Sequence, residues 1–404
     1  MWRAIVLLFL VNSVLAEEVD YKTVTLEDGI VKGEKYWDGE FYQFFGIPYA
    51  TLPKGRDRFQ APLPAKPWEG VLDASKKTTI CHQCYFTGDN NDEIMLDGED
   101  DCLVINLLTP IVASDDNLVP VVVYIHSGAF SGGGGTMAHF NYLARHDVIT
   151  VSFNYRLGAL GFASTAKNAA LSLGYNGTDS LDELTEFYLN ATVKDLAEKS
   201  LNYYLKNSTF GFAPCIENII EGIEPTITES PYELMSKGFN KDIAIITGFA
   251  NMEGISRTIK FGEWREDMNE DFSEFLPADL KFEDEKSRND LIREIKQYYF
   301  QGKEVKADTL QNYVNYFSDS MFKYSIMRSA NLRAKMTKKP VYVYQFSYVG
   351  KLNIEHNYMD RLKGASHRDQ TAYVLDFFGW TNNYKDLDTR ERMTMMWTDF
   401  VKYE

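Results

Sequence analysis

The sequence has little positive charge and, after its first residues, no long apolar run. It contains 42 Lys and Arg against 58 Asp and Glu in 404 residues, a net charge of −16. Nucleic acids and anionic membrane surfaces attract basic proteins, so this balance argues against both as partners. No segment after residue 16 offers the roughly 18 continuous apolar residues that a spanning helix needs, and we expect no transmembrane anchor. A hydrophobic content of 45% and a charged content of 25% are typical of a soluble globular protein.

The first sixteen residues have the pattern of a secretory signal. Arg3 gives the N-terminal region a positive charge, and residues 4–10 form an apolar stretch. Val14 and Ala16 are small residues at the −3 and −1 positions of a cleavage site before the acidic pair at 17–18. The apolar stretch is too short to span a bilayer. We therefore expect residues 1–16 to be removed and the protein to be secreted or lumenal.

Cysteines are few. Four occur, Cys81, Cys84, Cys102 and Cys215, and an even number in an oxidising compartment favours disulfides. Cys81 and Cys84 have the spacing of metal ligands, but no second pair stands nearby and the compartment disfavours zinc. We expect no metal site.

Three glycosylation sequons fall within 34 residues. They begin at Asn176, Asn190 and Asn207, and each has the Asn-x-Ser/Thr pattern. Because such short patterns also arise by chance, they indicate an exposed surface in a secreted glycoprotein without proving it.

The chain reads as one α/β domain from residue 17 to residue 404. An alternating stretch around Asp28-Gly29 predicts an antiparallel hairpin. Four continuous apolar runs predict strands covered on both faces, as in a parallel sheet; they lie at 119–125, 147–153, 243–248 and 341–346. Helical patterns cover 181–201 and 283–300, and mixed helices and strands indicate the α/β class.

A turn of small residues follows the strand expected at 119–125. It reads His126-Ser127-Gly128-Ala129-Phe130, and such a turn can aim several backbone N–H groups at one oxygen that becomes negative during a reaction. The alternative is a tight turn without a ligand. The four glycines at 132–135 lack the Gly-Lys-Ser/Thr ending of a phosphate loop, and we expect no cofactor.

The stretches around this turn resemble the carboxylesterase type B (cholinesterase-like) family of the α/β-hydrolase fold. The matches occur in family order along most of the chain; they are GIPYA at 46–50, DDCLVIN at 100–106, NYRLGALGF at 154–162, the loop 248–254 and the loop 364–369. The resemblance implies a mixed, mostly parallel sheet, a disulfide between Cys81 and Cys102, and hydrolysis of a small carboxylic ester.

The resemblance also implies roles for four residues. Glu253 would be the acid of a Ser-His-Glu triad and His367 its base, while Gly128 and Ala129 would form the oxyanion hole. Taken alone, a glutamate before a glycine is usually a solvated loop residue, and a histidine after a serine is usually polar surface.

The nucleophile of such a triad is missing, because no Gly-x-Ser-x-Gly occurs in the sequence. Glu253 follows Phe162 by only 91 positions, so a strand–elbow–helix segment of roughly 80–100 residues is predicted to be deleted near 163–169. Ser131, Ser164 and Ser366 are nearby serines, but none has flanking glycines in a strand–turn–helix context.

Such a deletion would remove a central strand of the sheet. The strands on either side would then keep unpaired N–H and C=O groups or be forced together. We expect a chain that is inactive or nearly so, produced as a deletion isoform or by an incomplete gene model. The alternatives are a non-catalytic binding or adhesion protein on the esterase scaffold, and a soluble binder that sequesters an ester or hormone.

Overall fold

The computed structural model describes residues 19–76, 79–87, 93–136, 140–163, 170–171, 173–178, 180–201, 206–207, 211–217, 219, 225–376 and 379–404. The predicted signal at 1–16, Ser164 and most of the predicted deletion point lie outside these residues.

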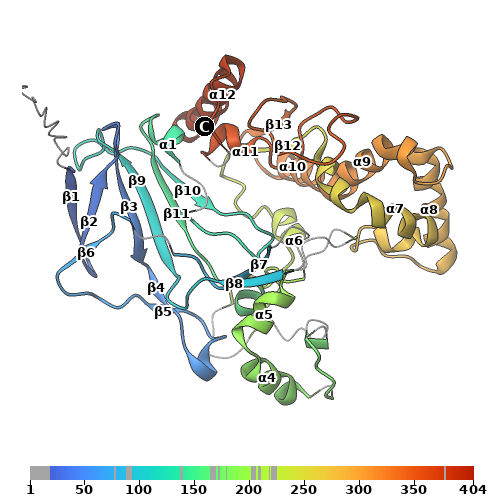
Figure 1. The fold of residues 1–404 in the computed structure, drawn as a ribbon, viewed down its shortest axis with the longest axis horizontal. Helices are drawn as coiled ribbons and strands as arrows, with labels where there is room; N and C mark the ends of the chain where they lie inside the picture. Colours follow the sequence, from blue (N-terminus) through green and yellow to red (C-terminus); the bar gives the residue numbers. More distant parts are fainter. Residues whose placement is uncertain are drawn as a thin grey trace, which may run out of the picture.

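The N-terminal half forms a twisted mixed sheet, at the left of Figure 1, in the order β1-β2-β3-β9-β11-β10. The hairpin predicted around Asp28-Gly29 is confirmed, because β1 and β2 pair in antiparallel fashion on either side of it. The strands are β1 (Tyr21–Leu26), β2 (Gly29–Lys35), β3 (Phe41–Pro48), β9 (Val104–Pro110), β11 (Ile149–Phe153) and β10 (Val121–Ile125), with β6 (Val71–Asp73) beside β2. Two short ribbons are β4 (Ala50–Thr51) with β5 (Leu63–Pro64) and β7 (Gln83–Thr87) with β8 (Glu93–Asp97).

The C-terminal half contributes a separate two-stranded parallel sheet, β12 (Ile245–Ala250) with β13 (Val341–Phe346). Within the described residues, no ladder joins β12 to the larger sheet, in which β10 is the last strand. The described strands therefore form two separate main sheets, one ending at β10 and one made of β12 and β13.

Two expectations about these strands need correction. The run at 119–125 was expected to be covered on both faces, but β10 exposes Val121, Val123 and Ile125 by 53%, 57% and 67%. Its other face packs through Val122 and Tyr124 against the core. The larger sheet is mixed, as expected. Parallel pairing does not predominate in the described ladders, which corrects the expectation: β1, β2, β3, β9 and β11 are joined in antiparallel fashion, and only β10 with β11 and β2 with β6 are parallel in this sheet.

The helices are mostly in the C-terminal half (Figure 1). The helix predicted at 181–201 is divided, because Ala191 is extended and the Thr192 side chain caps a new helix. The helix predicted at 283–300 is present and begins at an Asp284 cap. The α-helices are α1 (Asn141–Ala144), α2 (Gly158–Phe162), α4 (Leu181–Asn190), α5 (Val193–Lys199), α6 (Pro231–Ser236), α7 (Phe261–Glu270), α8 (Glu285–Phe300), α9 (Leu310–Ser318), α10 (Tyr324–Met336), α11 (Thr371–Val374) and α12 (Tyr384–Tyr403). Short 3-10 or π turns are η1 (Gly55–Asp57), η2 (Glu253–Lys260), η3 (Phe272–Phe275), η4 (Ala307–Thr309) and η5 (Asp319–Lys323).

Helix α12 packs against the cores of both main sheets. Its Met393 packs against the core of the larger sheet, which contains Phe41 and Leu108, and also against the core around β12 and β13, which contains Ala250 and Phe346. A third, aromatic-rich core around Trp264 and Phe317 lies among the helices from η2 to α9. The two sheets are thus linked by side-chain packing rather than by backbone pairing.

Candidate active site

The predicted acid and base come together. Strand β12 ends at Ala250, and Glu253 begins η2 three residues later. The Glu253 carboxylate is 97% buried; its Oε1 accepts from the Ala250 N–H at 2.7 Å and its Oε2 lies 2.8 Å from Nδ1 of His367. The carboxylate therefore contacts the Nδ1 side of the imidazole, and Nε2 lies on the opposite side of the ring. The His367 side chain is 38% exposed, so the imidazole of the predicted base is open to solvent.

The loops that carry these two residues are tied to each other. The Met252 N–H donates to the Ala365 carbonyl at 2.9 Å, and the Ala365 N–H donates to Oδ1 of Asn251 at 2.8 Å. At Gly364 φ is +150°, and a Cβ there would lie 2.3 Å from the Met252 side chain. Only glycine fits this contact, so a residue with a Cβ would push the two loops apart.

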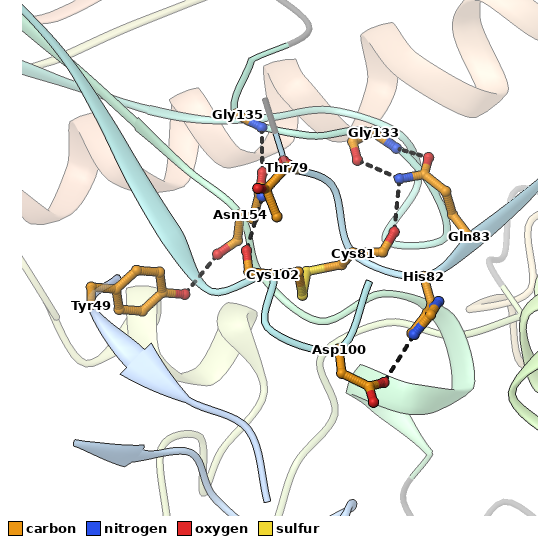
Figure 2. Close-up of a disulfide and its surroundings, with 10 residues drawn as sticks. All are labelled: Tyr49, Thr79, Cys81, His82, Gln83, Asp100, Cys102, Gly133, Gly135 and Asn154. Atoms are coloured by element: carbon orange, nitrogen blue, oxygen red, sulfur yellow. Dashed lines mark hydrogen bonds and ion pairs between the residues drawn. A yellow bond between two sulfur atoms is a disulfide. The ribbon is translucent and has the colours of Figure 1, made fainter. Parts of the chain in front are cut away.

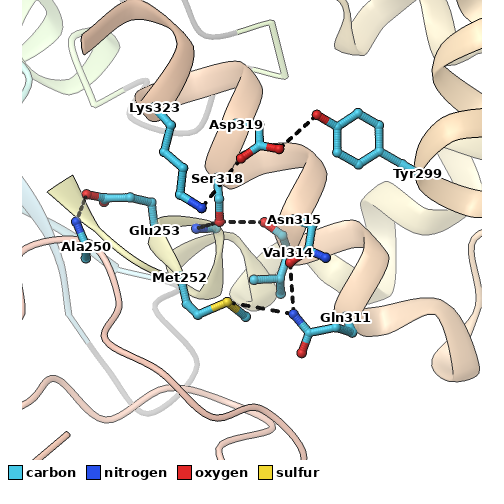
Figure 3. A network of polar contacts seen from close by, with 11 residues as sticks. Ala250, Met252, Glu253, Tyr299, Gln311, Val314, Asn315, Ser318, Asp319 and Lys323 are labelled. Atoms are coloured by element: carbon cyan, nitrogen blue, oxygen red, sulfur yellow. Dashed lines mark hydrogen bonds and ion pairs between the residues drawn. The ribbon is translucent and has the colours of Figure 1, made fainter. Parts of the chain in front are cut away.

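Helix α9 and the turn after it support the acid loop (Figure 3). The Gly254 N–H donates to Oγ of Ser318 at 2.9 Å, and that hydroxyl donates to the Val314 carbonyl at 2.7 Å. From η5, the Phe322 ring lies 4.6 Å from the imidazole of His367. Sequence analysis missed Ser318 and Phe322, because no motif links the acid loop to residues 64 or more positions away.

Asp369 holds the loop that follows the base. It is fully buried and accepts hydrogen bonds from the N–H groups of Ser366 and Ile354 and from Nδ2 of Asn353. Burial raises the pKa of the Asp369 carboxyl, and these three hydrogen bonds oppose that rise. The carboxylate therefore ties the turn that carries His367 to the segment of Asn353 and Ile354.

The proposed oxyanion loop has an unusual backbone. Gly128, Ala129 and Phe130 have φ values of +130°, +53° and +59°, and successive N–H groups in such turns can form a concave anion site. A Cβ on Gly128 would lie 1.9 Å from the Gly132 carbonyl oxygen, so glycine is required there. Among the described residues, the N–H groups of Gly128 and Ala129 donate to no protein acceptor.

Buried amides hold this loop in place, as Figure 2 shows. Gln83 makes two hydrogen bonds of 2.8 Å to the backbone of Gly133, and Asn154 accepts from the Gly135 N–H at 2.7 Å. Asn154 also donates to the Cys102 carbonyl at 2.9 Å. The predicted disulfide between Cys81 and Cys102 is present, with a Cα–Cα distance of 4.9 Å.

The serines considered as substitutes do not complete a triad in the described part of the chain. Ser131 is buried and its hydroxyl donates to the Ala129 carbonyl at 3.3 Å. Ser366 is fully buried and its hydroxyl has no partner, while Ser164 is outside the description. No described serine is hydrogen-bonded to His367.

The remaining predicted sites are distributed over the surface and core. Asn176 and Asn190 are exposed, and Asn207 is half-buried. Cys84 is buried and Cys215 exposed, both as free thiols. Over the residues with described positions, no group of three His, Cys, Asp or Glu side chains is placed to hold a metal ion. No described helix is both long and apolar enough to cross a bilayer.

Comparison with known proteins identifies the family. A sequence model of the carboxylesterase family matches residues 20–172 and 163–404. Esterase FE4 of Myzus persicae is 26% identical over 463 aligned positions, which cover 90% of this chain and 80% of that esterase. Venom carboxylesterase-6 of Apis mellifera is 25% identical over 424 positions, covering 82% of this chain and 74% of the relative. The crystal structure of juvenile hormone esterase from Manduca sexta matches with a TM-score of 0.79 at 23% identity, over 95% of this chain and 90% of that one. The fold is therefore that of the α/β-hydrolases, and the chain belongs to the carboxylesterase family.

Proposed function

We propose that this chain is a secreted member of the carboxylesterase family that lacks the catalytic serine and is inactive or nearly so. The reaction of the parent family is hydrolysis of a small carboxylic ester by a Ser-His-Glu triad. In this chain Glu253 stands at the position of the acid and His367 at that of the base. An oxyanion hole and a His–Glu pair without a nucleophile can polarise an ester and activate water. That residual catalysis lies some orders of magnitude below a complete triad.

The interruption between β10 and β12 carries this proposal. Strand β10 leads into the loop with Gly128, and β12 leads into the loop with Glu253. A strand placed between them would end between the oxyanion loop and the acid loop, where a nucleophile elbow has to stand. The single strand partner of β10 in the described sheet supports the loss of such a strand, and its exposed apolar face supports the loss of a helix that would pack on it.

The alignments give independent support. The match to Esterase FE4 spans 463 positions although it uses 90% of a 404-residue chain, so about a hundred positions of the alignment have no residue here. The family model matches the chain in two stretches that overlap at residues 163–172. This overlap coincides with the deletion point expected near 163–169. A deletion isoform or an incomplete gene model accounts for both observations.

Secretion and glycosylation belong to the same proposal. The signal pattern at 1–16, the Cys81–Cys102 disulfide and the exposed sequon residues Asn176 and Asn190 support export. One relative carries the name venom carboxylesterase. Asn207 is the third proposed glycan site.

Labelling with a fluorophosphonate probe tests the inactivity. The purified secreted chain should show no stoichiometric labelling, because no activated serine hydroxyl is present. Full-length Esterase FE4 tested under the same conditions is the positive control. Stoichiometric labelling of any serine, mapped by mass spectrometry, would overturn the proposal.

The gene provides the second test. Genomic sequence between the codons for Phe162 and Ala169 should contain an unused segment that encodes Gly-x-Ser-x-Gly. An uninterrupted exon across this point would rule out a deletion product and leave a genuinely non-catalytic homologue.

A further inference from the structure

A cavity lies beside the Cys81–Cys102 disulfide. Its volume is about 170 Å³, smaller than the sites of drug-sized ligands, so it suits a compact ligand. No residue of the oxyanion loop, the acid loop or the loop of the candidate base lines this cavity. Apolar and charged side chains share its wall; those used below are Leu157, Leu160, Val193, Arg58 and Arg156.

The other charged groups on the wall are paired or solvated. Nε2 of His82 lies 2.9 Å from a carboxylate oxygen of Asp100, as Figure 2 shows. The Nζ of Lys54 lies 3.5 Å from a carboxylate oxygen of Asp101, and both side chains are more than half exposed. Glu99 is also exposed to solvent. None of these groups therefore needs a ligand to balance its charge.

The two arginines on the wall have no carboxylate partner among the described residues. Nη2 of Arg58 donates to the Ala191 carbonyl at 2.7 Å and to the Tyr188 carbonyl. Nη1 of Arg156 donates to the Gln60 carbonyl at 2.8 Å and to the Arg58 carbonyl at 3.4 Å. In the described part of the chain, Nη1 of Arg58 and both Nε and Nη2 of Arg156 make no hydrogen bond. Each guanidinium thus bonds through one nitrogen to neutral carbonyls and keeps further N–H donors.

These two positive charges are only partly compensated. Burial lowers the pKa of Arg58 and of Arg156, which means that each cation loses hydration without gaining an anion in return. Both nevertheless stay charged, because a guanidinium is not deprotonated in proteins. A partly buried cation without a counter-ion keeps the cost of its desolvation. A small ligand with two negative charges would offset this cost.

We propose that this cavity binds a small phosphate monoester. The phosphate oxygens accept hydrogen bonds from Arg58 and Arg156, because planar guanidinium groups match phosphate oxygens and two cations match a dianion. The apolar group of the ester lies against Leu157, Leu160 and Val193. Binding here uses neither a nucleophile nor the oxyanion loop, so it goes beyond the proposed function.

Titration calorimetry of phenyl phosphate into the full secreted chain at pH 7 tests the proposal. Phenyl phosphate is mostly a dianion there, because the second pKa of a phosphate monoester is about 6. It should bind more tightly than phenyl sulfate, a monoanion of the same shape. It should also bind more tightly than inorganic phosphate, which has no apolar group to place against the leucines.

Two substitutions of Val193 change the charge of the wall without removing an arginine. Val193 is the first residue of α5, a position where an acidic side chain suits the helix. Val193→Glu should therefore fold, but should weaken phenyl phosphate binding about tenfold or more, because like charges brought together are costly. Val193→Gln has nearly the same size without the charge and should bind within about twofold of the wild type. Thermal unfolding checks that both variants are folded.

An arginine variant tests the hydrogen-bonding geometry. Arg156→Lys keeps the charge but loses the planar fork, and should weaken phenyl phosphate binding about tenfold. Arg56→Gln is the matched control, because Arg56 is exposed on the same loop as Arg58, pairs with Glu186 and does not line the cavity. This control should bind phenyl phosphate as the wild type does.

Four results would overturn the proposal. They are no binding of phenyl phosphate by the wild type, equal affinity for phenyl sulfate, equal affinity for inorganic phosphate, and unchanged affinity in both Val193→Glu and Arg156→Lys. Labelling of a serine by the fluorophosphonate probe would contradict the proposed inactivity and leave this site untouched, so the two proposals fail separately.

Discussion

At the scale of single residues, the buried Glu253 carboxylate holds together the acid loop and the histidine loop of the candidate site. Its carboxylate accepts from the Ala250 N–H and from His367, and it is almost completely buried. A buried group of this kind is stable only while its hydrogen bonds are made, because an unpaired buried donor or acceptor is costly. The pair is therefore a structural element of this fold even without a nucleophile.

Replacing Glu253 should reveal this structural role. Glu253→Ala leaves the buried Ala250 N–H without an acceptor and should lower the free energy of unfolding by about 2–3 kcal/mol. Glu253→Gln keeps an acceptor and should cost about 1 kcal/mol. Urea denaturation at pH 7 measures both. Glu263→Ala, at an exposed ion pair with Lys260, should change stability by less than about 0.5 kcal/mol, and equal losses in Glu253→Ala and Glu263→Ala would contradict the argument.

At the level of elements, β10 is the strand that most departs from its sequence pattern. Its unbroken apolar run is typical of a strand buried on both faces, yet Val121, Val123 and Ile125 are exposed. The same strand has a pairing partner on one side only in the described sheet. An exposed apolar edge strand is a site for pairing with other chains.

Two lysine substitutions in β10 should have opposite effects. Val123→Lys, on the exposed face, should leave stability within about 0.5 kcal/mol and reduce aggregation, because a charge on an edge strand opposes pairing between chains. Val122→Lys points toward the core of Phe41 and Leu108 and should cost more than about 2 kcal/mol. Light scattering on heating and urea denaturation measure the two effects. Unchanged aggregation in Val123→Lys would show that this edge is not the site of association.

At the level of the whole molecule, side-chain packing by α12 links the two main sheets, which no backbone ladder joins in the described part of the chain. Met393 contacts the core of the larger sheet and the core of β12 and β13. Because no described ladder joins the sheets, the stability of each depends on this helix more than it would in a continuous sheet.

Truncating Met393 should therefore loosen both sheets together. Met393→Ala should cost about 1–2 kcal/mol, since the side chain is half-buried, and hydrogen exchange should become faster in both β11 and β12. Met395→Ala, on the exposed side of the same helix, is the control and should leave both strands unchanged. Faster exchange in only one strand of Met393→Ala would show that α12 does not couple the sheets.

The sequence by itself determined much of the local secondary structure and which residue types stand at the candidate site. The hairpin at Asp28-Gly29, the strands at β10 to β13 and the start of α8 follow from turn residues, apolar runs and a capping aspartate, which act over short distances. Glu253 and His367 could be named in advance only through the resemblance to a family, because 114 positions separate them.

Only the tertiary structure decided what surrounds these elements. An apolar run does not reveal whether a helix packs on each of its faces, so the exposed face of β10 could not be predicted from periodicity. The placement of Ser318 beside the acid loop and of Phe322 beside His367 likewise depends on contacts between distant segments. Such contacts are set by packing and hydrogen bonding of the whole chain, which local patterns do not record.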